Sequence, residues 1–493
     1  MSSLLELSHE LLHCIFIEIT PADLSSLSQT CRMLHSYTRN NRLLHKDLYM
    51  RRYDEPQRPD HDVDWEGELH QLVTLEKMLQ SGSRERKAGY LGFVSQQAGY
   101  LIENARTDQE NSRNLHLLSK YFTDTVNLDV FLCSSGLFER AGNGDQVAAS
   151  TPALRQASAK LHCLFGVPIC QIPSRASYSR ERPDVHLFPS MCTRHQMQPH
   201  LVHTYARSKV YDLRGYKDAN LWGPFMDDGS HCVDWEKVEA IMIVVGFNLN
   251  RCSDRTQCRW PRVWNRPFVG TTPNSYVSLP SVTVAPKNSD DEMVRLRELA
   301  LGLDAQDPYG VSGTWMRVVC FLDYNDLYAF NFGPPIPDDQ PRPPIDTEEV
   351  LVLIKLKLRV TRIEPPGSDD EDDLDWGRFR GERLPIVHFR GTSRSLQGWD
   401  PNAQSRIRGT VRQTPEGEIH WTMFSIFHGE ERWRSEGIQV GGLRSARGVL
   451  GNWFDKDYDE YGPAGPMACW KLTDDVDEDR MTGMAALGHG FIH

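Results

Sequence analysis

The apolar residues of this chain change their spacing along the sequence, and this change constrains the fold more than any other feature. Up to about residue 140 they recur at helical intervals. The first such stripe consists of Leu7, Leu11, Leu12, Ile15 and Ile19. Beyond about residue 160 apolar and polar residues tend to alternate, which is typical of strands with one buried face. We therefore expect a helical part followed by a β-rich part.

Composition narrows the class of protein. A chain of 493 residues with 19 Phe, 16 Tyr and 12 Trp is too long for one core and too aromatic to be disordered. The net charge of -12 disfavours binding to phosphate backbones, so we expect no nucleic-acid partner. The richest apolar run, residues 241–247, is too short to cross a bilayer, so we expect no membrane association. Eleven scattered cysteines without a C-x-x-C pair favour a reducing compartment, the cytoplasm and/or the nucleus.

Residues 4–53 are predicted to form three short helices. The second begins at Thr20, which precedes Pro21 at the first helical position, and its apolar stripe runs through Leu24, Leu27, Cys31 and Leu34. The third covers residues 41–53 and includes Leu44. So small a unit carries more apolar surface than its own interior can use. A helical connector is expected to follow over residues 54–140.

In order and spacing, the residues from Leu7 to Arg52 resemble the F-box family. Ser8 stands where that family usually has proline, and Leu44 stands where an aromatic residue is common. The resemblance implies a motif that packs on a Skp1-type adaptor and through it reaches a cullin scaffold. It assigns adaptor binding to Leu7, Leu11, Leu12, Ile15, Ile19, Pro21, Leu24, Leu27, Cys31, Leu34 and Leu44. The alternative is an ordinary helical subdomain that packs against the rest of the chain.

The remainder, residues 160–493, is predicted to be a β-rich recognition domain. Strand-like runs occur at residues 240–249, 276–284, 313–332, 349–363, 436–440 and 468–472. One helix is expected at residues 291–301. A hairpin is indicated by runs at 406–412 and 418–427 around the turn at 414–417. The predicted class is α+β: an F-box at 1–53 and a helical connector, then a mainly antiparallel β barrel or sandwich with long loops.

The carboxy-terminal part carries further resemblances. Five segments are similar to the tail of a group of fungal F-box proteins: residues 408–412, 427–433, 436–439, 445–455 and 462–466. More loosely, the run from Gly313 onward is similar to the barrel-like substrate domain of the animal F-box-only protein that recruits D-type cyclins. Both resemblances imply that this domain binds a protein substrate.

Aromatic and guanidinium side chains supply the candidate substrate-binding residues. These are Trp433, Arg447, Trp453 and Phe454, because Trp and Arg are favoured anchors at protein interfaces. The alternative for each is interior packing, since tryptophans at strand spacing usually lie in a core.

The sequence indicates neither a metal centre nor an active site. Cys192, His195, His200 and His203 lie close together, and Cys252 and Cys258 could add thiolates, but the spacing matches no zinc motif. The chain lacks the G-x-S-x-G, P-loop and H-E-x-x-H motifs. We therefore expect no catalytic residue, metal or cofactor, although zinc binding by the cysteine and histidine group stays open.

These features predict a non-catalytic substrate receptor of a Skp1-cullin-F-box (SCF) ubiquitin ligase, which recruits proteins for ubiquitination and degradation. One alternative is a barrel that encloses a small ligand, and a deep apolar pocket inside the sheet would favour it. Another is an F-box protein that acts with Skp1 outside a ligase. The sequence does not separate that case from the first.

Overall fold

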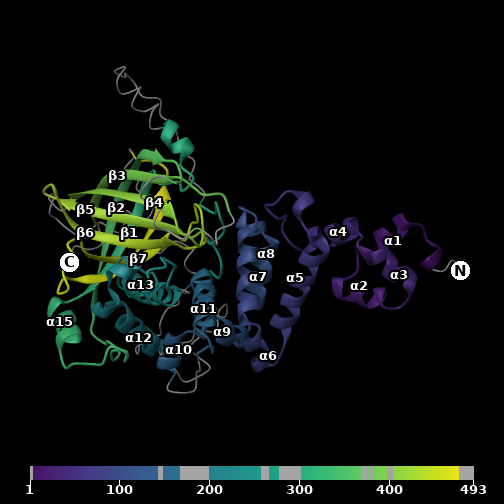
Figure 1. The fold of residues 1–493 in the computed structure, drawn as a ribbon, viewed down its shortest axis with the longest axis horizontal. Coiled ribbons are helices and arrows are strands. Elements are labelled where there is room, and N and C mark those ends of the chain that lie inside the picture. The colour runs from purple at the N-terminus through teal and green to yellow at the C-terminus, as the bar shows by residue number, and fades with distance from the viewer. Residues whose placement is uncertain are drawn as a thin grey trace. The chain divides into compact units, whose positions relative to one another are not determined.

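The chain folds into two compact units. A computed structural model describes residues 4–142, 148–166, 199–256, 266–276, 301–367, 376, 381–396 and 404–476. Unit 1 comprises Met1–Phe131 and unit 2 comprises Leu132–His493. In its described residues unit 1 is helical, whereas unit 2 combines helices with a β barrel (Figure 1). This confirms the predicted α+β class.

After a 3-10 helix at Leu4–Glu6, unit 1 has four short α-helices rather than the predicted three helices. They are α1 (His9–Phe16), α2 (Pro21–Ser28), α3 (Arg32–Thr38) and α4 (Arg42–Arg52). The predicted second helix is interrupted because Thr30 Oγ1 donates to the carbonyl of Leu27, at 2.7 Å, and Cys31 is extended. Cys31 therefore precedes α3 instead of continuing α2.

Five more helices follow in unit 1, as the helical periodicity predicts. They are α5 (Trp65–Gln80), α6 (Arg84–Gly89), α7 (Leu91–Glu103), α8 (Arg113–Tyr121) and α9 (Thr125–Leu132), where α9 reaches the boundary between the units. Asp54, directly after α4, is 3% exposed and accepts hydrogen bonds from Ser112 Oγ and from the backbone N–H groups of Arg106 and Arg113. This buried carboxylate joins the chain after α4 to the beginning of α8.

Unit 2 contains helices ahead of its first strand. They are α10 (Gly136–Ala141), α11 (Pro152–Phe165), α12 (Pro199–Tyr211) and α13 (Trp235–Thr256). The strand predicted at residues 240–249 is wrong, because this segment lies inside α13. Six residues in a row there are at most 9% exposed, from Ala240 to Val245, so the apolar period of a helix is absent. No helix in the described part of the chain is both long and apolar enough to span a bilayer.

Eight strands form a closed antiparallel barrel in the order of the chain. They are β1 (Gly313–Leu322), β2 (Glu349–Glu364), β3 (Ile386–Ser395), β4 (Gln404–Gln413), β5 (Ile419–Phe427), β6 (Glu430–Gln439), β7 (Val449–Asp455) and β8 (Ala464–Thr473). Pairing of β1 with β8 closes the sheet. The predicted barrel and the β4–β5 hairpin are thus confirmed.

Other strand predictions have mixed outcomes. The run at residues 313–332 is a strand only as far as Leu322, because Asp323 caps a helix, α15 (Tyr324–Phe332). Of the run at 276–284 only Tyr276 lies in the described residues, and of the helix at 291–301 only Leu301. The strands β3 and β7 had not been predicted.

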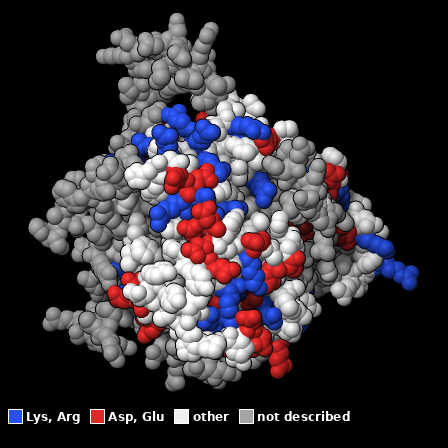
Figure 2. Space-filling model, turned by 60° about the vertical axis from the view of Figure 1, so that its left-hand side comes forward, with Lys and Arg blue, Asp and Glu red and all other residues white. Residues whose placement is uncertain are grey.

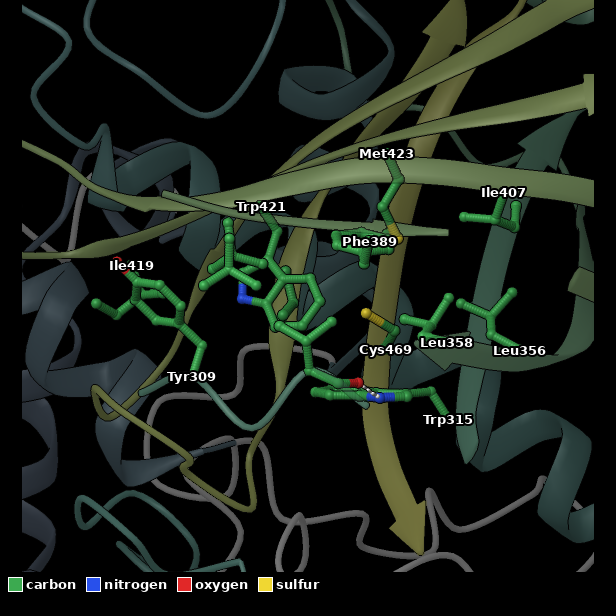
Figure 3. Close-up of a cluster of buried hydrophobic side chains, with 14 of the residues drawn as sticks. Tyr309, Trp315, Leu356, Leu358, Phe389, Ile407, Ile419, Trp421, Met423 and Cys469 are labelled. Atoms are coloured by element: carbon green, nitrogen blue, oxygen red, sulfur yellow. Dashed lines mark hydrogen bonds between the residues drawn. The ribbon is translucent and has the colours of Figure 1, made fainter. Parts of the chain in front are cut away.

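Apolar side chains fill the centre of the barrel (Figure 3). Trp315 and Trp421 meet edge to face with ring centroids 5.0 Å apart, and Phe389 packs beside Trp421. Trp315 Nε1 donates to the carbonyl of Val311 at 2.9 Å, and Trp421 Nε1 donates to Gln439 Oε1 at 3.1 Å. Both indole N–H groups are therefore satisfied inside the barrel.

Helices cover one side of the barrel. α13 packs against β7, β8, β1 and β2, and α12 packs against β8. Glu349, at the beginning of β2, accepts hydrogen bonds from Arg207 Nε at 2.5 Å and Tyr211 Oη at 2.7 Å, both on α12. Asn248 on α13 donates to the same carboxylate at 2.7 Å. One buried acid thus connects both helices to the sheet.

Replacing Trp421 by Ala should destabilise unit 2 strongly. The side chain is 0% exposed at the centre of the barrel, so truncation leaves a large cavity and an unpaired Gln439. We expect the free energy of unfolding to fall by about 3–5 kcal/mol. Urea unfolding followed by fluorescence measures this. Arg406→Ala, at an exposed position on β4, is the matched control and should change it by less than about 0.5 kcal/mol.

Candidate partner-binding surfaces

Helix α1 has two apolar faces. Leu12 and Phe16 are each 1% exposed and belong to the interior of unit 1. Leu11 and Ile15, four residues apart and therefore on one side of the helix, are 53% and 41% exposed. In the described part of the chain this second face stays exposed, so it is a candidate surface for a partner protein.

Contacts with the neighbouring helices hold α1 in place. His13 Nε2 lies 2.8 Å from Asp47 Oδ2 on α4. Arg51, also on α4, donates to the carbonyl of Ile17 at 2.6 Å and to Glu18 Oε1 at 2.7 Å. Tyr37 Oη on α3 donates to the carbonyl of His9 at 3.0 Å. The exposed face of α1 is thus presented by a helix fixed at both ends.

Further exposed apolar residues occur in α4, in α3 and in a 3-10 helix, Leu4–Glu6, ahead of α1. Leu43 is 60% exposed, Met33 is 39% exposed and Leu4 is 38% exposed. The sequence prediction did not assign these three residues to adaptor binding, because an apolar pattern alone does not separate the exposed positions of a short helix from its buried ones.

The structure divides the predicted adaptor-binding residues into three groups. Leu11 and Ile15 are exposed, and Leu7, Ile19, Leu27 and Cys31 are half-buried. The buried ones are Leu12, Pro21, Leu24, Leu34 and Leu44. The buried side chains pack in the core of unit 1. They hold the helices that present the exposed residues in place.

Side chains cap the starts of α2 and α4, but not that of α1. Thr20 Oγ1 accepts a hydrogen bond from the N–H of Asp23 at 3.1 Å, and Asn41 Oδ1 accepts one from the N–H of Leu44 at 3.2 Å. Ser8 occupies the corresponding position of α1, but its hydroxyl does not accept a bond from the helix backbone.

Arg447, one of the predicted substrate-binding residues, lies in the interior. It is 1% exposed, and its guanidinium donates to the carbonyls of Val269, Phe165 and Arg266 at 2.9–3.1 Å. Burial lowers the pKa of Arg447 to about 9, which still leaves it charged at neutral pH. Gly166, at φ 93°, lies so close that a Cβ atom there would overlap the guanidinium. Arg447 therefore joins segments of unit 2 instead of facing a partner.

The predicted aromatic residues are also largely internal. Phe454 is 0% exposed and packs with Trp222 at a centroid distance of 5.5 Å. Trp453 is 8% exposed and donates from Nε1 to the carbonyl of Cys320 at 3.0 Å. Trp433 is half-buried and meets Trp453 edge to face at 5.2 Å. Of the predicted substrate-binding set, only Trp433 offers appreciable surface.

Two buried acid–histidine pairs have residue types found in active sites. His162 Nδ1 lies 2.6 Å from Glu239 Oε1, and His420 Nε2 lies 2.5 Å from Glu436 Oε2. All four side chains are at most 3% exposed. None of them lines either of the two hollows described next. Their role in this structure is to satisfy buried charge.

Two hollows in unit 2 have polar linings. One, of about 300 Å³, lies at an end of the barrel and is lined by Trp315, Gln439, Lys471 and several acids. The other, of about 340 Å³, lies among the helices and is lined by Lys209, Lys237 and other charged residues. Neither is the deep apolar pocket that would favour a barrel enclosing a small apolar ligand.

The possible zinc ligands are not brought together in the described residues. Cys192, His195 and Cys258 lie outside those residues, as does the side chain of His200. His203 stacks on Phe247 with centroids 3.5 Å apart and lies 3.5 Å from Glu349. Among the described side chains, no group of three or more His, Cys, Asp or Glu could hold a metal ion.

Basic and acidic side chains lie next to one another on the surface. Figure 2 shows Lys and Arg beside Asp and Glu over much of the face in view, with uncharged surface between them. Arg408, for example, forms a bidentate pair with Glu431. This pattern differs from the continuous basic field that a phosphate backbone requires.

Comparison with known proteins identifies one segment. Residues 4–46, which include α1–α3 and the beginning of α4, match the F-box domain family. No curated protein and no solved structure matched the chain.

Replacing Arg447 by Met should lower the stability of unit 2. The substitution leaves several buried carbonyl groups without their donor, and we expect the free energy of unfolding to fall by about 3 kcal/mol or more. Thermal unfolding measures the change. Arg432→Met, at an exposed position on β6, is the control and should have little effect. A stable Arg447 variant would argue against this interior role.

Unit 2 should lose stability as the pH falls from 7 to 5. Burial, opposed by Glu349 and aided by Arg207, lowers the pKa of His203 from 6.5 to about 4. The unfolded chain therefore binds more protons than the native protein between these values, so lowering the pH favours unfolding. We expect a loss on the order of 2 kcal/mol from this group. Urea unfolding at both pH values measures it.

The histidine at position 203 can be separated from other groups by substitution. His203→Gln should show a smaller difference between pH 7 and pH 5 than the parent. His428→Asn, at an exposed position, should keep the parent's difference. An unchanged difference in the His203 variant would assign the pH dependence elsewhere.

Proposed function

We propose that this chain, which carries an F-box domain at residues 4–46, is the substrate-receptor subunit of an SCF-type ubiquitin ligase. The observation that carries the proposal is the exposed face of α1, where Leu11 and Ile15 are 53% and 41% exposed inside the matched segment. In this proposal that face packs against a Skp1-type adaptor, which connects the chain to a cullin scaffold.

The energetics of the exposed face favour a protein partner. Large apolar side chains in water gain about 1.5–3 kcal/mol each when they become fully buried. Leu11, Ile15 and Leu43 retain much of this potential gain, because each is more than 40% exposed. Leu12 and Phe16 stabilise the helix from the inner side, so α1 can present its outer face without unfolding.

The proposed role is non-catalytic. The chain would hold a target protein near a ubiquitin-loaded enzyme, and the reaction rate would rise through proximity alone. The two buried acid–histidine pairs fit this role, since neither is accessible to a substrate. Unit 2 would recruit the target for ubiquitination and degradation, in the cytoplasm and/or the nucleus. The more specific resemblances, to fungal F-box proteins and to the cyclin-directed animal protein, stay predictions.

Two alternative functions require different features of the structure or of the purified complex. A receptor for a small apolar ligand needs an open barrel interior, and the packing of Trp315, Phe389 and Trp421 weighs against it. An F-box protein that works with Skp1 outside a ligase would use the same face of α1. Only the presence or absence of a cullin in the purified complex separates it from the proposed function.

Aspartate substitutions on the exposed face of α1 test adaptor binding. The variant Leu11→Asp, Ile15→Asp should keep its fold, because both positions are exposed, and should weaken binding to purified Skp1 by more than about tenfold. Surface plasmon resonance measures the affinity, and circular dichroism checks the fold. Copurification of a cullin with the parent alone would support the ligase role.

The control substitution is Tyr90→Asp. Tyr90 is an exposed aromatic residue of unit 1, 39% exposed, outside the matched segment. It should bind Skp1 as the parent does. Equal binding by the α1 variant and the parent would sink the proposal. Leu12→Asp is unsuitable for this purpose, because a buried charge at that position would disrupt the core.

A further inference from the structure

The outer face of α15 carries a row of exposed aromatic side chains. Tyr324, Tyr328 and Phe332 are spaced four residues apart, so they share one side of the helix, and they are 51%, 45% and 39% exposed. Tyr461, from the loop between β7 and β8, is 53% exposed and extends the row. We call these four residues the aromatic surface.

The members of the aromatic surface contact one another in sequence. The ring centroids of Tyr324 and Tyr328 are 6.2 Å apart, and those of Tyr328 and Phe332 are 4.9 Å apart. Phe332 and Tyr461 are separated by 4.8 Å, and Tyr324 Oη donates to the carbonyl of Tyr461 at 3.4 Å. The rings thus form one continuous surface from two separate parts of the chain.

The fold of α15 does not require this surface. On an adjacent side of the helix, Leu327 is 2% exposed and packs in a cluster with Tyr211 and Leu322. Asn331 donates from Nδ2 to the carbonyl of Tyr211 at 3.0 Å and accepts from the N–H of Leu213 at 2.9 Å. Because the inner face anchors the helix, the outer aromatic residues remain available to a partner.

The chain around the aromatic surface is acidic. Residues 318–341 contain Asp323, Asp326, Asp338 and Asp339 but no Lys or Arg. Arg317 and Arg342, which bound this segment, are buried, and Arg214 lies 3.9 Å from Asp338. Residues 457–463 also contain no Lys or Arg, and Asp459 and Glu460 directly precede Tyr461 there. A basic partner is complementary to this environment, whereas a nucleic acid or an anionic membrane would be repelled.

We propose that the aromatic surface binds a Lys- and Arg-rich segment of a partner protein. The cations would lie over the faces of the tyrosine rings and near the flanking carboxylates, while neighbouring apolar side chains of the segment would cover the row. That the partner is a target for ubiquitination rests on the proposed function. The binding surface itself does not depend on it.

An array of immobilised synthetic peptides of random sequence tests the proposal. The labelled full-length chain is compared with the variant Tyr324→Ala, Tyr328→Ala, Phe332→Ala. The matched control, Asn325→Ala with Ala329→Ser, changes two exposed positions of the same helix outside the row. We expect peptides rich in Lys and Arg to bind the parent and the control at least about tenfold more tightly than the aromatic variant.

A charge-reversal variant keeps the test informative if the aromatic variant is destabilised. Glu460→Lys, directly before Tyr461, should weaken the same peptides, and added salt should weaken their binding to the parent. The proposal is overturned if no peptide discriminates parent from variant, or if the discriminating peptides are acidic or uncharged. Self-association of the parent that the aromatic variant abolishes would overturn it too, because a second copy would be the occupant.

Binding to Skp1 is measured on the same preparations. If the parent and the aromatic variant bind the same peptides equally but the parent binds Skp1, the inference about the aromatic surface is wrong and the proposed function stands. If the parent binds basic peptides but does not bind Skp1, the inference about the aromatic surface is supported and the proposed function is wrong.

Discussion

Closure of the sheet is the constraint on which unit 2 depends. β1 and β8 pair antiparallel, with Met316 opposite Trp470, and this pairing leaves neither strand with a free edge. A closed sheet of this size must fill its own interior, which Trp315 and Trp421 do. Adjacent strands and interior side chains must also approach one another closely. At Gly409 on β4, a Cβ atom would lie 2.2 Å from the carbonyl oxygen of Thr422 and 2.5 Å from the Phe389 ring, so only glycine fits.

Closure also determines where the helices of unit 2 lie. Strands β7 and β8 are buried along nearly their whole length, because the barrel interior covers one face and α13 covers much of the other. A helix in that position is apolar on all sides, as residues 240–245 are. The carboxylate of Glu349 then has to be satisfied inside the protein, and Arg207, Tyr211 and Asn248 supply the donors. The charged network is thus a consequence of helices packing on a closed sheet.

The same facts explain which features could be predicted from the sequence. Amphipathic segments such as α1 and the β4–β5 hairpin have one solvated face, so their periods were readable, and the capping of α2 by Thr20 was correct. In α13 complete burial removed the period, and β-branched residues suggested a strand. For the candidate site, the sequence placed Leu11 and Leu12 in one stripe but could not say which is exposed. The burial of Arg447 could not be predicted, because its partners are backbone carbonyls, which leave no sequence pattern.

The two candidate surfaces have the same physical origin. In α1 and in α15 a short helix is apolar on two sides, and the inner side alone anchors it, through Leu12 in one and Leu327 in the other. The outer side then costs stability in water unless a partner covers it, so it is better explained by binding than by folding. The surroundings distinguish the partners. The aromatic surface is flanked by acids such as Glu460, directly before Tyr461, and offers ring faces to cations, whereas the outer face of α1 is aliphatic and matches an apolar helix surface. A chain with both surfaces could bind an adaptor and a basic target segment at once.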